Sequence, residues 1–309
     1  MKNAKTIGSA MGVVSGIAYG FYGIFSSMLL KAGVKELSII AIPPLVLVVY
    51  FGIRILFKPR ALKSIPGKIY LLLIVQGGLI ATAMNFCYQK AYASGMPVGV
   101  VSIVAFCNVI VVMVLSRFLL KYQFTKQKII AVLIAIFGVS LVIGIFGETV
   151  SGGYTAQGLL WTLLIPLFYG TNVVLNTYAL MHGCDSDGVM LIAQGASLVV
   201  VLVFMVTPAA LFQDLTVHLS GEEAWIGFLG FIIIPNMITY AAMQESLKRI
   251  DPTIYQIMMS LDPVVALILG VLVMKQTVTG MQLLGVLIVL AAVVFITIID
   301  GHTNTETID

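Results

Sequence analysis

Ten apolar segments of about membrane-spanning length fill this chain of 309 residues, and its second half resembles a second copy of its first. Phe21-Tyr22-Gly23 in the first segment recurs 147 residues later as Phe168-Tyr169-Gly170 in the sixth. Later matches, offset by 154 residues, pair Lys121, Thr125 and Val132-Leu133-Ile134 with Lys275, Thr279 and Val286-Leu287-Ile288. Five segments per copy is an odd number, so the copies must cross the membrane in opposite directions. Inverted repeats of this kind are typical of secondary transporters.

The composition excludes a soluble globular protein, because 60% of the residues are hydrophobic, 10% are charged and the mean hydropathy is +1.08. We expect an all-α integral membrane protein with ten transmembrane helices, built as two inverted five-helix repeats over 1–150 and 151–309. The Gly-rich stretch at 151–153 separates the copies, and the first segment is expected to be retained. The predicted spans are 9–30, 36–57, 69–89, 96–116, 128–146, 157–179, 188–207, 224–245, 253–274 and 279–299.

The basic residues predict the orientation of these spans. If the N-terminus is cytoplasmic, thirteen lysines and arginines lie on the inner side and four on the outer side. This bias follows the positive-inside rule, so both termini and the short acidic tail are predicted to be cytoplasmic. The inner set is Lys2, Lys5, Arg54, Lys58, Arg60, Lys63, Lys68, Arg117, Lys121, Lys126, Lys128, Lys248 and Arg249, and the outer set is Lys31, Lys35, Lys90 and Lys275.

Several polar side chains fall about 9–15 residues into their spans, near the middle of the membrane. Further polar side chains lie on the same helical faces at the spacing of successive turns. Such groups are costly to bury in hydrocarbon without partners, so we predict that they line a shared cavity that binds substrate. The alternative is that these side chains form hydrogen bonds between helices and serve only to hold the bundle together. The candidates are Tyr19, Tyr22, Asn85, Tyr88, Asn108, Tyr169, Asn172, Asn176, Asn236, Tyr240 and Asp262.

Asp262 is the only carboxylate predicted to lie well inside a span. An ionisable group at that depth is a functional-site hypothesis by default. Burial favours its neutral form, which suits a group that exchanges a proton during transport. A permanent hydrogen bond to a neighbouring helix is the structural alternative. Asn108 is its counterpart in the first copy and carries no charge.

Other residues are assigned to packing or to chain geometry. The three scattered cysteines and three histidines indicate neither a disulfide framework nor a metal site, and no cofactor is expected. Gly12, Gly16 and Gly20 are spaced for close helix packing. Kinks or broken helices are predicted at Pro43-Pro44, Pro166 and Pro235.

These residues resemble the drug/metabolite transporter superfamily in its EamA-type ten-helix branch, over nearly the whole chain. The resemblance rests on the two aromatic-glycine triplets and on the segments 260–270 (SLDPVVALILG) and 279–285 (TGMQLLG). The chain departs from the family pattern at Lys121 and Lys275, where the family usually has Glu, and at Val109, where it usually has Pro. The resemblance implies that spans one to four and six to nine surround a central cavity, with spans five and ten peripheral. It also implies a small metabolite cargo such as an amino acid, often exported.

The leading functional hypothesis is a secondary active transporter of a small polar metabolite, located in a prokaryotic plasma membrane, with coupling to protons through Asp262 as part of the hypothesis. A carrier for an organic cation, held by tyrosines and Asp262, is the alternative. An intramembrane enzyme or a channel lacks support, since neither a catalytic set nor repeated filter residues are present. A structural membrane subunit stays open. The expected partners are a small-molecule substrate and membrane lipid, with no nucleic acid and with a homodimer left open.

Overall fold

The computed structural model describes residues 2–58, 60–63, 65–120, 126–143, 154–206, 221–247, 249, 255, 258–259 and 261–303. Within these ranges the chain is helical and contains no strand. The predicted linker at 151–153 and the repeated residues Lys121 and Thr125 lie outside the described part of the chain.

Each predicted span contains helix, and several spans are divided into shorter elements. The elements are α1 (Lys2–Tyr19), α2 (Tyr22–Lys31), α3 (Glu36–Leu56), α4 (Arg60–Lys63), α5 (Gly67–Val75), η1 (Gln76–Ala81), α6 (Thr82–Ala93), α7 (Val98–Phe106), α8 (Asn108–Leu119), α9 (Lys126–Ile143), α10 (Ala156–Met181), α11 (Ser186–Val206), α12 (Glu222–Ile232), η3 (Ile233–Ile238), α13 (Thr239–Leu247), α15 (Leu261–Leu272) and α16 (Gly280–Thr303).

Seven helical runs are long and apolar enough to cross a membrane, among the residues that the structure describes. They cover Thr6–Lys31, Glu36–Leu56, Gly67–Ala93, Val98–Leu119, Ala156–Met181, Ser186–Met205 and Glu222–Leu247. Two shorter apolar helices, Leu261–Leu272 and Gly280–Ala292, follow them. The chain is therefore a multi-pass helical membrane protein, while the count of ten crossings stays a prediction.

Of the predicted proline positions, Pro235 lies in the irregular segment η3, whereas the helix is unbroken at the other two. Helix α3 continues through Pro43 and Pro44, and α10 continues through Pro166. The first span instead breaks at Gly20 and Phe21, between α1 and α2. A Cβ atom on Gly20 would lie 2.6 Å from the Cβ of Val265, so only glycine permits this approach to α15.

Two π-helical segments occupy the third span of each half, η1 in the first and η3 in the second. A π-helical segment inserts an extra residue into the turn and often marks a functional site. In η3 the irregular turn contains Pro235, whose nitrogen has no hydrogen to donate, so the regular ladder is interrupted there. Both segments lie near the middle of their spans.

Helix α16 begins with a reciprocal pair of hydrogen bonds from the segment that carries the family resemblance. The backbone N–H of Thr279 donates to Oε1 of Gln282 at 3.0 Å, and the backbone N–H of Gln282 donates to Oγ1 of Thr279 at 3.2 Å. This arrangement is a capping box, which satisfies two donors that a helix start would leave free. The Thr and Gln of this motif therefore have a structural role.

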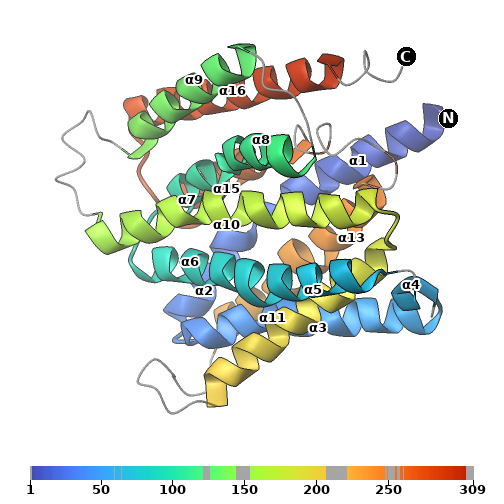
Figure 1. Cartoon of the computed structure of the whole chain (residues 1–309). Coiled ribbons are helices and arrows are strands. Elements are labelled where there is room, and N and C mark those ends of the chain that lie inside the picture. The colour runs from blue at the N-terminus through green and yellow to red at the C-terminus, as the bar shows by residue number, and fades with distance from the viewer. Residues whose placement is uncertain are drawn as a thin grey trace.

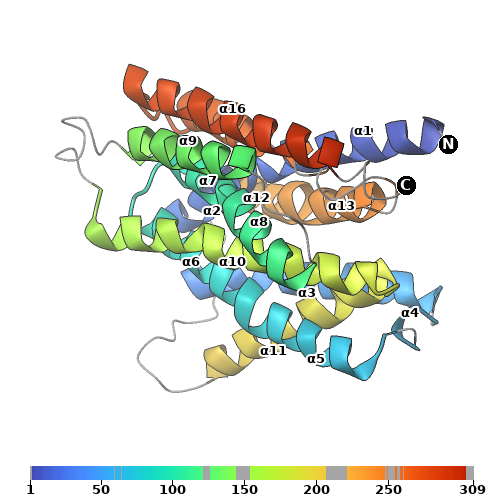
Figure 2. The same ribbon diagram turned by 45° about the horizontal axis from the view of Figure 1, so that its top comes forward.

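The helices of the first half pair with those of the second half throughout the bundle. Helices α1 and α2 pack against α13 and α12, α3 against α11, and α6 against α10. The remaining pairs are α7 with α15 and α9 with α16. Helices α9 and α16 form a separate layer on one side of the bundle, which the two views of Figures 1 and 2 show. The start of α1 and the end of α16 lie at the same end of the bundle (Figure 1).

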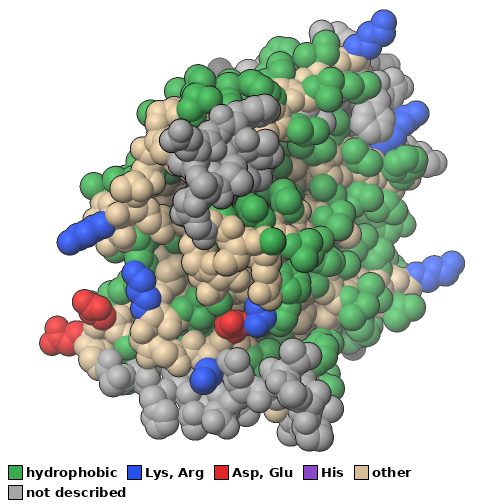
Figure 3. Space-filling model, turned by 90° about the vertical axis from the view of Figure 1, so that its left-hand side faces the viewer, with side chains coloured by type: hydrophobic (Ala, Val, Ile, Leu, Met, Phe, Trp, Pro, Cys, Tyr) green, Lys and Arg blue, Asp and Glu red, His purple; other side chains and the backbone are tan. Residues whose placement is uncertain are grey.

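The flanks of the bundle are apolar. Figure 3 looks onto the end of the bundle that lies at the left of Figure 1, where several charged side chains stand, and hydrophobic side chains gather around the sides of this face. The exposed large side chains include Leu56, Leu133, Leu160, Val203, Ile226 and Leu272. In water such a surface would aggregate, whereas in a bilayer it is solvated by hydrocarbon.

Candidate functional site

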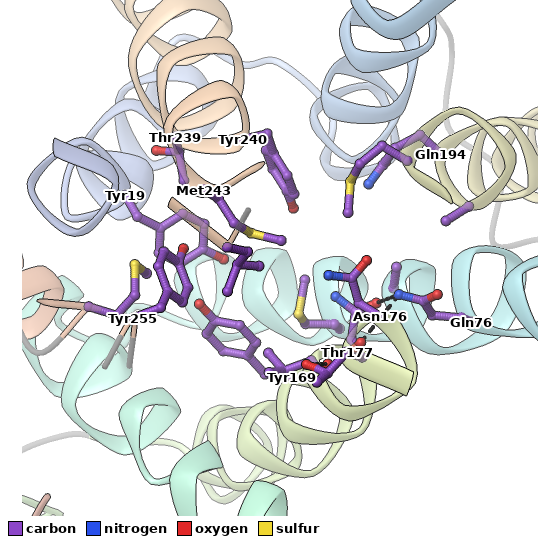
Figure 4. Close-up of a pocket in the computed structure, with 18 residues that line it drawn as sticks. Tyr19, Gln76, Tyr169, Asn176, Thr177, Gln194, Thr239, Tyr240, Met243 and Tyr255 are labelled. Atoms are coloured by element: carbon purple, nitrogen blue, oxygen red, sulfur yellow. Dashed lines mark hydrogen bonds between the residues drawn. The ribbon is translucent and has the colours of Figure 1, made fainter. Parts of the chain in front are cut away.

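A small cavity of about 50 Å³ lies between the two halves of the chain. This space holds only a few water molecules, so the described conformation leaves no room in it for a metabolite. Figure 4 looks into this cavity and shows helices arranged around it. Its lining comes from α1, η1, α6, α10, α11, α13 and the short stretch at 255–259.

One side of the cavity is aromatic. Tyr19, Tyr169 and Tyr255 stand together there, and Tyr240 points in from α13 (Figure 4). The ring centroids of Tyr19 and Tyr169 are 5.9 Å apart, within the range of favourable aromatic contact. The hydroxyl of Tyr255 lies 2.9 Å from Oγ of Ser15, which fixes that ring against α1.

The opposite side carries amide side chains, namely Gln76, Asn172, Asn176 and Gln194. Nε2 of Gln76 donates to Oδ1 of Asn172 at 3.0 Å and to the backbone carbonyl of Asn172 at 3.2 Å. Oε1 of Gln76 stays buried without a hydrogen-bond partner among the described residues, and Oδ1 of Asn176 also has none. The amide side therefore offers free hydrogen-bond acceptors.

Asp262 lies beside the aromatic side and is 3% exposed. It does not line the cavity in this conformation. It interacts electrostatically with Tyr88, Tyr92, Tyr169 and Tyr255. A buried carboxyl group favours its neutral form, and it can exchange a proton when its surroundings change.

A hydrogen-bonded cluster of Tyr22, Ser26, Asn85 and Gln89 joins α2 to α6 toward the end of the bundle where both helices end. The hydroxyl of Tyr22 donates to Oδ1 of Asn85 at 3.2 Å and accepts from Nε2 of Gln89 at 3.2 Å. Oγ of Ser26 donates to Oε1 of Gln89 at 2.5 Å. Tyr88 packs against Tyr22 with ring centroids 5.3 Å apart. Tyr22, Asn85 and Tyr88 thus contact one another, not the cavity.

Two more of the predicted site residues lie outside the cavity. Nδ2 of Asn236 donates to the carbonyl of Phe231 at 2.7 Å, because the π-helical turn leaves that carbonyl without its regular partner. Asn108 begins α8 and is 1% exposed, with neither side-chain polar atom bonded to a described residue. Of the eleven predicted residues, the five that line the cavity are Tyr19, Tyr169, Asn172, Asn176 and Tyr240.

An ion-pair network at the opposite end of the bundle was not predicted. The guanidinium of Arg54 lies 3.1 Å from Oδ2 of Asp187 and 3.9 Å from Oε1 of Glu245, and Nζ of Lys58 lies 3.6 Å from Oδ2 of Asp187. The network ties α3 to α11 and α13. The sequence analysis used Arg54 and Lys58 only to predict orientation, and only the packing of the helices brings them to Asp187 and Glu245.

Sequence reasoning also missed Gln76, Gln194 and Tyr255 as cavity residues. Gln76 and Gln194 are each an isolated polar residue within an apolar run, and this isolation was the sequence signal that could have identified them as cavity residues. Met84, Met190, Met243 and Met259 complete much of the lining, and nothing in the sequence separates them from core methionines.

The fold and the cavity define a helical membrane protein with a narrow site between two halves, lined by polar and aromatic side chains. A family model described as "EamA-like transporter family" matches residues 6–144 and 156–298. The chain belongs to this family, which confirms the resemblance given by its sequence motifs.

Three curated bacterial proteins are similar to this chain. An "Uncharacterized transporter YxxF" of Bacillus subtilis is 24% identical over 59% of this chain and 56% of its own length. A "Probable amino-acid metabolite efflux pump" of Salmonella typhimurium is 24% identical over 81% of this chain and 84% of its own length. "Protein PecM" of Dickeya dadantii is 26% identical over 76% of each chain. A solved crystal structure shares the fold with a TM-score of 0.65 at 15% identity, covering 94% of this chain and 96% of that chain.

Proposed function

We propose that this transporter moves a small polar metabolite with a primary amino group, such as an amino acid, by alternating access across a bacterial plasma membrane. The observation that carries the proposal is the two-sided cavity. Its amide side offers the free acceptors of Gln76 and Asn176, and its aromatic side offers tyrosine rings. An ammonium group would satisfy these acceptors, and an apolar or aromatic substituent would stack on the rings.

The narrow cavity and the contacts toward both ends of the bundle support alternating access. The cluster of Tyr22, Asn85 and Gln89 bonds helices together toward one end, and the pair of Arg54 and Asp187 does so at the other. We propose that these contacts open in turn. The inverted repeat is part of this proposal, and it is supported by the paired packing of the two halves and by the two separate segments that match the family model.

We propose that Asp262 couples transport to protons and that the direction is export. Its burial in α15 supports proton exchange, because its charge would be unfavourable there. The similarity to a protein named as an efflux pump supports export.

A carrier for organic cations is the second candidate, and the tyrosines around Asp262 favour it. Aromatic faces attract cations, and the carboxylate would supply the countercharge. A quaternary amine, however, has no N–H group to satisfy the acceptors of Gln76 and Asn176. The two candidates therefore differ in whether the cargo must donate hydrogen bonds.

Counterflow in proteoliposomes tests the proposal, with amino acids, primary amines, quaternary amines and nucleosides as cargo. Asn176→Leu removes one free acceptor while keeping the number of heavy atoms and the branched shape of the side chain, and we expect uptake of the preferred cargo to fall roughly tenfold. Thr171→Val is the matched control on the same helix, because the hydroxyl of Thr171 bonds its own helix at the carbonyl of Leu167. Transport of quaternary amines alone, unaffected by Asn176→Leu, would reject the amino-group proposal.

A further inference from the structure

A second cavity is larger than the central one and has no role in the proposed transport cycle. Its volume is about 420 Å³, and its wall comes from α3, η1, α6, α10 and α11. We call it the seam groove because both halves of the chain line it. Its lining includes Leu37, Leu79, Phe86, Trp161, Phe168 and Val200.

The wall of the seam groove is almost entirely apolar. The hydroxyl of Thr82 is already bonded to Oγ of Ser197 at 2.9 Å and to the carbonyl of Gly77 at 3.1 Å. Phe86 and Trp161 meet edge to face with ring centroids 5.5 Å apart. Apart from Nε1 of Trp161, which is buried without a partner among the described residues, the lining offers a polar metabolite nothing in exchange for its hydration, so the groove suits hydrocarbon.

The depth of the groove matches one leaflet. Leu37 is at the start of α3, and Trp161 is about five residues into α10, or roughly 8 Å along its axis. Leu79 lies about 14 residues before the end of α6, or roughly 20 Å from the same end of the bundle. Since the hydrocarbon core is about 30 Å thick, the groove extends from the interface to about the middle of the bilayer.

A pair of opposite charges stands at the shallow end of the groove. Nζ of Lys90 lies 2.6 Å from Oε2 of Glu36 and 5.6 Å from the centroid of the Phe86 ring. Glu36 directly precedes the lining residue Leu37. The groove therefore has a cation and an anion at the depth of a headgroup and hydrocarbon walls below them, which complements a zwitterionic lipid.

We propose that the seam groove binds one acyl chain of a phospholipid from the adjacent leaflet. Four of the five elements that line it, η1, α6, α10 and α11, also line the central cavity. On α10, Phe168 lines the groove and Tyr169 lines the cavity, and on α11 Val200 lines the groove and Gln194 lines the cavity. A chain in the groove would brace the crossing of η1 and α11. Bound lipid would thereby influence movements that open the cavity.

The two tryptophans of the chain provide the test. Trp161 lines the groove, whereas Trp225 is 50% exposed on α12 at a similar depth. In proteoliposomes containing phospholipid brominated in the upper acyl chain, Trp225→Phe leaves Trp161 as the only tryptophan fluorophore. We expect bromine to quench Trp161 about as strongly as it quenches Trp225 in the converse variant, Trp161→Phe.

Ala83→Phe and Val200→Phe each place a ring in the groove, and either variant suffices if the other does not fold. In the Trp225→Phe background, we expect each to lower the quenching of Trp161 at least twofold. Leu163→Phe, on the exposed face of α10, is the control and should leave it unchanged. Undiminished quenching in both filled variants would overturn the proposal. Quenching by brominated free fatty acid but not by phospholipid would overturn it as well.

Discussion

The guanidinium of Arg54 and the buried carboxylate of Asp187 are 3.1 Å apart and join the two halves of the transporter at one end of its cavity. Asp187 is in the first turn of α11, where the helix dipole also favours a negative charge. The contact therefore holds the helices together and provides a candidate gate.

Arg54→Gln should lower the free energy of unfolding in detergent by about 3 kcal/mol, because it leaves the Asp187 carboxylate without its main partner. Asp187→Asn should cost less, since Arg54 is partly exposed and lies 3.9 Å from Glu245. Lys35→Gln, at an exposed lysine, is the control. Thermal unfolding measures the series, and equal losses for Arg54→Gln and Asp187→Asn would contradict the role of burial.

Gly77→Ala should lower the free energy of unfolding by about 1–3 kcal/mol, because overpacking forces the backbone apart. A Cβ atom at this position would lie 1.7 Å from the carbonyl oxygen of Ala193, where η1 crosses α11. Gly52→Ala is a matched control in α3, since nothing lies within 4 Å of its added methyl group. We expect that control to be neutral or slightly stabilising. If Gly77→Ala were as stable as the wild type, η1 and α11 could not cross as closely as the structure shows.

Asp262→Asn should abolish transport driven by a pH gradient while leaving folding and substrate binding intact, because the amide fixes the neutral form. If Asp262 instead binds a cationic cargo directly, binding itself should weaken at every pH. Binding and gradient-driven flux, measured on wild type and this variant, separate the two roles. Unchanged driven flux in the variant would remove Asp262 from the mechanism.

The predicted orientation places the loop at 59–68 in the cytoplasm and the loop at 90–95 outside. A membrane-impermeant thiol reagent added outside should label Ser94→Cys and miss Ser64→Cys. The native Cys87, Cys107 and Cys184 are buried, and they should be replaced by serine in the background protein. Ser64 lies outside the described residues, so this prediction rests on the basic residues of the sequence. Labelling of Ser64→Cys and not of Ser94→Cys would show that the orientation is the reverse of the predicted one.

The sequence by itself determined the class of protein and its helical segments. Apolar runs near the length of a bilayer leave helices as the means to satisfy the backbone, so helix occurs at every predicted span. The motifs at 21–23, 168–170 and 260–270 were specific enough to identify the family. These features are local, and periodicity and length report local structure directly.

Only the tertiary structure decided which polar residues meet. Tyr22 and Tyr169 occupy matching places in the repeated triplet, yet Tyr169 lines the cavity and Tyr22 bonds Asn85 and Gln89. The break at Gly20 and the two π-helical segments redirect side chains that a regular helical stripe would align. A one-residue shift in a helical turn rotates a side chain by about 100°, so the site depends on irregularities that the packing of one half against the other imposes.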